Sequence, residues 1–177
     1  MKKIKYLLGA FPTFLSLIAV QIKLSGGAKL ISPFSVIIVK FHVKSLGSNN
    51  RLDFGKRCRL LRTKVSFSGK NNICKFDGVA VGTIIEVQGE GNEVVLCENS
   101  GIKNSRIVVR GNNLNVTIGK NATIGNNCWL VTMGNKHCIN IGEECMIADN
   151  VDLWASDTHP IRDKKIWKSQ TFQAVLK

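Results

Sequence analysis

A near-constant repeat of 20 to 23 residues runs through most of the chain and constrains its fold more than any other feature. Each repeat opens on an apolar residue, and successive openings are separated by 22, 20, 22, 23 and 23 positions. The six openings are Val43, Val65, Ile85, Ile107, Leu130 and Leu153. A period in this range indicates units that stack only on their neighbours, so the sequence predicts a solenoid.

Successive repeats align residue by residue. A shift of 23 carries residues 107–112 onto residues 130–135, and in the first turn a shift of 22 carries Cys58 onto Ala80. Apolar, glycine and small positions stay in register over these shifts. An antiparallel β-sandwich also alternates strands and turns. It explains the turns but not the register, so we favour the solenoid.

A six-residue rhythm appears inside the later repeats. Ile118, Ile124 and Leu130 are spaced by six, and each is followed by small and polar residues typical of one short strand and one corner. Three such strands close a coil of about eighteen residues, and the next coil lies about 4.8 Å away, joined by parallel-strand hydrogen bonds. The remaining residues of each turn are placed at Gly-Asn corners, where positive φ costs least. These corners are residues 47–50, 69–72, 91–92, 111–113 and 134–137.

The hexads that begin Ile118-Gly119 and Ile141-Gly142, followed by the turn Ser156-Asp157-Thr158-His159-Pro160, resemble the hexapeptide-repeat acyltransferases. Within that family, the residues are most similar to the bacterial sugar and polysaccharide O-acetyltransferases. The resemblance is strong over residues 107–161 and weaker over residues 43–106. It implies an all-β fold, a left-handed parallel β-helix, and a homotrimer with active sites between subunits. The handedness is taken from the resemblance, because parallel crossovers are usually right-handed.

The resemblance also implies an activity, which is acetyl-CoA-dependent O-acetylation of a sugar. The acceptor is expected to be a sugar or lipid-linked oligosaccharide of a capsule, O-antigen or exopolysaccharide. Acetyl-CoA is then the acyl donor, and no metal is needed. Trp154 and Ser156, which lie just before the His-Pro turn, are the candidate acetyl-CoA contacts.

His159 is the candidate catalytic base. The 23-residue shift maps Lys136 onto His159, which places the imidazole on a protruding corner. Acetyl transfer needs a base for the proton of the attacking hydroxyl, and an imidazole with an ordinary pKa of about 6.5 serves at neutral pH. Pro160 restricts His159 to extended geometry, and Asp157 is a candidate to orient the ring. The resemblance places the base at the same histidine.

The other two histidines, His42 and His137, have no comparable support. His137 falls on a Gly-Asn corner, where we expect it to be solvated. Zinc carbonic anhydrases use the same kind of solenoid and need three histidines around the metal. Because this chain has three histidines in all and no close pair, the sequence argues against a zinc site.

Positive charge is concentrated in the first part of the chain. Residues 1–70 hold 14 Lys and Arg against Asp53 alone, whereas residues 71–177 hold 11 residues of each sign. Such a basic end suits a nucleic acid or an anionic membrane face. The apolar run 6–20 between lysines favours lipid over nucleic acid, which makes a basic nucleic-acid-binding protein the weaker alternative.

We therefore predict peripheral membrane contact through residues 1–45, and a cytoplasmic protein at the inner face of the cytoplasmic membrane. Run 6–20 has 15 residues and contains Pro12, which makes it short for a membrane span. Burial as a cap or in trimer packing, and a signal peptide or a membrane span, remain alternatives.

The chain is expected to form three segments. Residues 1–42 form an apolar, basic N-terminal cap or membrane-surface segment, residues 43–161 the parallel β-helix acyltransferase domain, and residues 162–177 a basic tail without hexads. Family members usually continue with further coils that line the acetyl-CoA groove. The tail therefore indicates either a short variant or a truncated, non-catalytic β-helix protein without the donor site.

The six cysteines contain no CxxC pair, and we expect them to be reduced packing residues. Cys58, Cys128 and Cys145 take the small position of the hexad. A disulfide framework is the alternative that an even count suggests.

Overall fold

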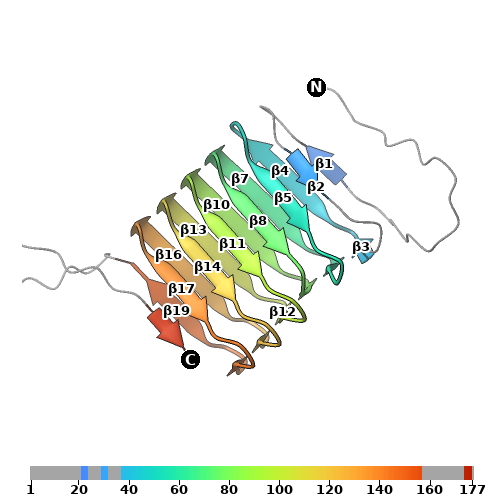
Figure 1. Cartoon of the computed structure of the whole chain (residues 1–177), viewed down its shortest axis with the longest axis vertical. Coiled ribbons are helices and arrows are strands. Elements are labelled where there is room, and N and C mark those ends of the chain that lie inside the picture. Colours follow the sequence, from blue (N-terminus) through green and yellow to red (C-terminus); the bar gives the residue numbers. More distant parts are fainter. Residues whose placement is uncertain (1–20, 24–28, 32–36, 157–173, 177) are drawn as a thin grey trace, which may run out of the picture.

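The computed structural model describes the backbone of residues 21–23, 29–31, 37–156 and 174–176, and the side chains of residues 37–156. Within these ranges every regular element is a β-strand. The described residues include no helix long and apolar enough to cross a bilayer. The strands form three sheets around one core, in a solenoid of about five turns (Figure 1).

Each turn of the solenoid adds one strand to each sheet. Sheet 1 contains β1 (Gln21–Lys23), β4 (His42–Leu46), β7 (Lys64–Lys70), β10 (Ile84–Glu90), β13 (Arg106–Asn112), β16 (Trp129–Asn135) and β19 (Asp152–Ala155). Sheet 2 contains β2 (Lys29–Ile31), β5 (Arg51–Phe54), β8 (Ile73–Phe76), β11 (Glu93–Leu96), β14 (Asn115–Ile118), β17 (Cys138–Ile141) and β20 (Ala174–Leu176). Sheet 3 contains β3 (Ile37–Val39), β6 (Arg59–Leu61), β9 (Val79–Val81), β12 (Gly101–Lys103), β15 (Thr123–Ile124) and β18 (Met146–Ile147).

The predicted repeat is confirmed at the level of single residues. The six apolar openings lie side by side in sheet 1, from Val43 beside Val65 to Leu130 beside Leu153. All described strand pairs in the three sheets are parallel, which confirms the parallel β-helix and excludes the antiparallel sandwich. Strands β1, β2 and β20 pair with β4, β5 and β17, so the sheets also include residues before 43 and after 161.

One predicted alignment was wrong. The structure pairs Ala80 with Leu60, and the carbonyl of Gly78 accepts a hydrogen bond from the residue that follows Cys58. The cause is the corner between sheets 2 and 3, which spans residues 55–58 in the first of these turns but only residues 77–78 in the next. Two residues are lost there, which accounts for the one spacing of 20.

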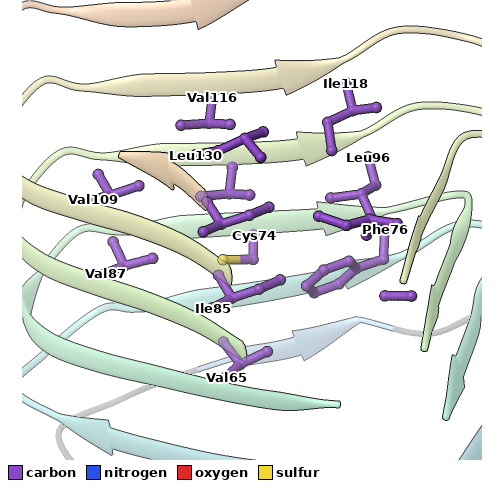
Figure 2. Packing of buried hydrophobic residues seen from close by; sticks show 14 of the residues in the cluster. Val65, Cys74, Phe76, Ile85, Val87, Leu96, Val109, Val116, Ile118 and Leu130 are labelled. Atoms are coloured by element: carbon purple, nitrogen blue, oxygen red, sulfur yellow. The ribbon is translucent and has the colours of Figure 1, made fainter. Parts of the chain in front are cut away.

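Aliphatic and aromatic side chains fill the interior in columns (Figure 2). Phe76, Leu96 and Ile118 succeed one another along sheet 2, and each is at most 1% exposed. The ring of Phe54 stacks on Phe76, with centroids 5.9 Å apart. Each buried side chain therefore contacts its equivalents in the neighbouring coils, and burial of this apolar surface stabilises the stack.

The corners between sheets 1 and 2 contain a column of five glycines with positive φ, from +99° to +141°. They are Gly47, Gly69, Gly89, Gly111 and Gly134. In the first four, a Cβ atom would collide with the carbonyl group of the next glycine in the column. Glycine is required here both by the backbone conformation and by the close approach of the next coil.

Buried asparagines form a ladder beside the glycines. The side-chain oxygen of Asn50 accepts a hydrogen bond from the backbone N–H of Asn72, and Asn72 repeats this with Asn92, each at 3.1 Å. Their side-chain amides donate to glycine carbonyls of the next coil, as from Asn72 to Gly89 at 2.9 Å. The ladder satisfies polar groups that would otherwise be buried without partners.

Candidate functional site

The predicted catalytic turn follows directly after β19. Thr132 and Ala155 are register partners, and the described chain continues from Ala155 to Ser156. Asp157 and His159 lie outside the described residues, so their placement and their roles stay predictions. The structure thus places the start of this turn at the edge of sheet 1, next to β16.

Of the two predicted acetyl-CoA contacts, Trp154 lies on the outer face of sheet 1. Its side chain is 51% exposed, although its register partner Val131 is buried. Ser156 is half-buried two residues later. The structure therefore brings an exposed indole and a hydroxyl together immediately before the His-Pro turn.

A polar and aromatic cluster on the same face was not predicted from the sequence. Arg106 Nη2 lies 2.6 Å from Glu86 Oε1, and the Arg106 guanidinium lies over the Trp129 ring at 5.2 Å from its centroid. Arg110 Nη2 approaches the other carboxylate oxygen of Glu86 at 3.8 Å. A guanidinium over an indole is a favourable cation–π contact. The cluster holds charge and aromatic surface next to the strand that leads into Ser156.

The repeat alignment contained the signal for this cluster. Arg106 and Trp129 are register partners, and each lies one position before the apolar residue that opens its turn. Side chains alternate between the two faces of a strand, so the position before a buried residue points outward. A search of the aligned repeats for outward columns would have found the pair.

The prediction that His137 is solvated was wrong. His137 is 1% exposed, and its carbonyl accepts a hydrogen bond from Asn115 N–H at 3.1 Å, the place that Asn72 and Asn92 occupy in earlier coils. Its imidazole lies close to Gly134. The imidazole is thus buried at the corner position that the ladder asparagines take in earlier coils, although Leu114 in the intervening coil interrupts the ladder.

His42 is half-buried on the outer face of β4 and lines a hollow with Lys44 and Lys64. Within residues 37–156, no three His, Cys, Asp or Glu side chains are grouped so that they could hold a metal ion.

All six cysteines are free thiols in the structure. Cys58 and Cys128 are fully buried, and Cys145 is half-buried against the core, as expected for small packing positions. Burial raises the pKa of the Cys74 thiol, and the Glu93 carboxylate adds to the effect. The pKa of Cys97 is raised for the same reasons, by burial and then by Glu143 and Asp77. Raised pKa values make these two thiols poor nucleophiles.

We expect the Cys58 thiol to resist alkylation by iodoacetamide at pH 8 while the protein is folded. Burial, assisted by the Asp77 carboxylate, raises its pKa from 9.0 to about 12. Only the thiolate reacts, and its fraction below the pKa falls tenfold per pH unit, so labelling should be about 10³-fold slower than for an exposed cysteine. Mass spectrometry of the labelled peptide, before and after denaturation, measures the difference. Equal rates in the two states would contradict the prediction.

Comparison with known proteins adds evidence of descent. No protein-family model matches the chain. A 66-residue stretch is 44% identical to a polysialic acid O-acetyltransferase of Escherichia coli O1:K1 / APEC. The solved structure of the polySia-specific acetyltransferase NeuO superposes on 77% of the chain with a TM-score of 0.62 and 33% sequence identity.

The chain is a homologue of polysialic acid O-acetyltransferase. The resemblance to hexapeptide-repeat acetyltransferases, expected from the hexads, is thereby confirmed. The present chain spans 20% of the length of the curated relative and 62% of the length of the solved chain. Agreement in both sequence and fold supports common ancestry more strongly than the solenoid alone, since one fold hosts many functions.

Proposed function

We propose that this protein is an O-acetyltransferase that transfers the acetyl group of acetyl-CoA to a sugar hydroxyl of a bacterial surface polysaccharide. The observation that carries the proposal is the homology to polysialic acid O-acetyltransferase, with 33% identity over an alignment that covers 77% of the chain. Because the relative acts on polysialic acid, an acidic capsular polymer of this class is the favoured acceptor.

In the proposed reaction His159 acts as general base. Its imidazole takes the proton from the sugar hydroxyl as the oxygen attacks the carbonyl carbon of the thioester. The carbon–sulfur bond then breaks, the CoA sulfur leaves with the proton returned by the imidazolium, and the acetyl ester remains on the sugar. Asp157 would orient the ring and stabilise its charged form.

Trp154 and Ser156 are the residues that we assign to acetyl-CoA. The exposed indole of Trp154 offers an apolar surface for the pantetheine arm, and the Ser156 side chain lies two residues further along the chain. Both stand directly before the turn that carries His159, so a donor bound along β19 would present its thioester to that turn.

Assembly and location belong to the same proposal. We infer a homotrimer with the active site between subunits, and peripheral attachment to the inner face of the cytoplasmic membrane through residues 1–45. Light scattering of the purified protein tests the first, and flotation with anionic vesicles tests the second.

Acetyl transfer is tested by incubating the purified chain with labelled acetyl-CoA and polysialic acid. We expect label to appear in the polymer as a base-labile ester. If no ester forms, calorimetry with acetyl-CoA separates two explanations. Lack of binding favours a non-catalytic solenoid without a donor site, whereas binding without transfer indicates another acceptor.

A further inference from the structure

Several cationic side chains gather where the first coils enter sheet 1. Lys44 lies on the outer face of β4, and Lys64 lies on the outer face of β7 beside His42. Lys40 and Arg62 occupy the corners that precede these two strands, one above the other, with the Arg62 N–H bonded to the Val39 carbonyl at 2.8 Å. We call these five residues the basic face: Lys40, His42, Lys44, Arg62 and Lys64.

Three other cations of the first coils have carboxylate partners. Arg51 contacts Asp53 at 2.9 Å, Lys70 contacts Glu90 at 3.2 Å, and Arg57 pairs with Glu98. By contrast, none of the four Lys and Arg side chains of the basic face forms an ion pair within the described part of the chain. Their charge is therefore available to a partner from outside.

The basic face borders a hollow of about 540 Å³ in the surface of sheet 1. Its lining includes His42, Lys44 and Lys64, together with the hydroxyl of Ser66. Glu86 also lines the hollow, at the far side, but its carboxylate is already bonded to Arg106. An anionic ligand in the hollow would meet two lysines at one side and a neutralised carboxylate at the other.

The same outer face continues to the proposed acetylation turn. Four strand steps separate β7 from β19, which is about 19 Å at 4.8 Å per step. Between them lie the guanidinium groups of Arg106 and Arg110 and then the exposed indoles of Trp129 and Trp154. The face therefore runs from cations to the exposed indoles beside the proposed donor site, over a length that several linked sugars can span.

We propose that the outer face of sheet 1 is a docking track for an acidic polysaccharide with one carboxylate per sugar. The basic face binds one part of the polysaccharide, and other sugar units of the same polysaccharide reach the turn after β19. This inference rests on the proposed function for the identity of the polymer, but it concerns a binding site far from His159. Charge complementarity is the physical basis, because repeated carboxylates meet cations that form no ion pair within the described residues.

A nucleic acid is a poorer fit to this surface. Single strands are held by aromatic side chains interleaved with the cations. Among the described residues, the aromatic side chains of the strands and corners around the basic face, Phe41 and Phe67, are at most 2% exposed and belong to the core. The exposed indoles lie at the other end of the sheet.

The test compares two double variants with equal loss of charge. Lys44→Gln with Lys64→Gln removes charge from the basic face. Arg59→Gln with Lys103→Gln removes the same charge from two exposed positions on sheet 3, away from the proposed track. Both are made in the His159→Ala background, so that binding of polysialic acid is measured without turnover, and light scattering checks that assembly is unchanged.

We expect the first variant to bind polysialic acid about five- to tenfold more weakly and with a smaller dependence on salt, whereas the second binds as the parent does. The same polymer with its carboxylates reduced to alcohols should not bind. Equal affinity of the two variants would overturn the proposal, as would tighter binding of duplex DNA or anionic vesicles through the same lysines. If the parent protein transfers acetyl groups but the first variant binds the polymer as the parent does, the proposed function is supported and the docking track is contradicted. If the polymer binds through the basic face but no acetyl group is transferred, the docking track is supported and the proposed function is contradicted.

Discussion

Replacing His159 with alanine is expected to lower the rate of acetyl transfer by about 10²- to 10⁴-fold, which is the usual contribution of a positioned general base. The sugar hydroxyl would then have to lose its proton to water while it attacks the thioester. The melting temperature should not change, because the repeat places His159 on a protruding corner and outside the stacked columns. Acetyl-CoA affinity should also be retained, since the imidazole acts on the acceptor hydroxyl.

Lys103→Ala is the control for this experiment. Lys103 is an exposed residue of β12 in sheet 3, outside the face that the polysaccharide is proposed to follow. Its replacement also shortens an exposed side chain to alanine, but it touches neither the proposed chemistry nor the proposed docking track. Initial rates at saturating acetyl-CoA, with circular dichroism of each variant, decide the outcome. A His159→Ala enzyme that keeps the parent rate would remove this residue from the mechanism.

Replacing Gly89 with alanine is expected to destabilise the solenoid by about 3–5 kcal/mol. Gly89 has a φ of +112°, and its new Cβ would lie 2.8 Å from the carbonyl carbon of Gly111 and closer still to the oxygen. Backbone strain of this kind costs about 1–3 kcal/mol, and the forced separation of two coils adds a similar overpacking cost. Because each coil rests on its neighbours, the separation would weaken contacts on both sides.

Gly101→Ala provides the control, since it adds the same methyl group to another strand. There the nearest atom to the added Cβ is the Thr123 methyl carbon at 3.9 Å, which is an ordinary contact, and the φ of Gly101 is not in the positive range. The change should cost less than about 1 kcal/mol and can be stabilising, because alanine has less backbone entropy to lose. Urea denaturation followed by circular dichroism measures both variants. Similar midpoints for the two would show that the glycine column is not a steric requirement.

Much of the fold could be predicted from the sequence because each inward position must match the position above it. The stacking of Val65 on Val43, and of Ile118 on Leu96, follows directly from spacing and from apolar character. The prediction failed where a corner changed length. The corner at residues 77–78 is two residues shorter than its equivalent in the preceding turn, so Ala80 lies beside Leu60. The length of such a corner cannot be predicted from its residues, because they have no apolar pattern that must match the next coil.

The site was predicted less completely than the fold. The resemblance predicted a catalytic turn that contains His159, and the role of this turn, like the acetyl-CoA roles of Trp154 and Ser156, stays a prediction. Outward-facing residues have no neighbour that requires them to match, so their partners do not follow from a repeat of apolar positions. The aligned repeats place Arg106 and Trp129 in one outward column, but the contact between the guanidinium and the indole was seen only in the three-dimensional structure.

The sequence by itself determined the repeat, the parallel stacking, the columns of the core and the concentration of positive charge in the first coils. Only the tertiary structure decided which cations of those coils are paired and which, like Lys44 and Lys64, face outward beside a hollow. It also decided that His137 is buried. The physical reason is the same in each case. A stacked core repeats along the chain, whereas burial of a corner residue and pairing of a surface charge depend on the neighbours that lie one coil away.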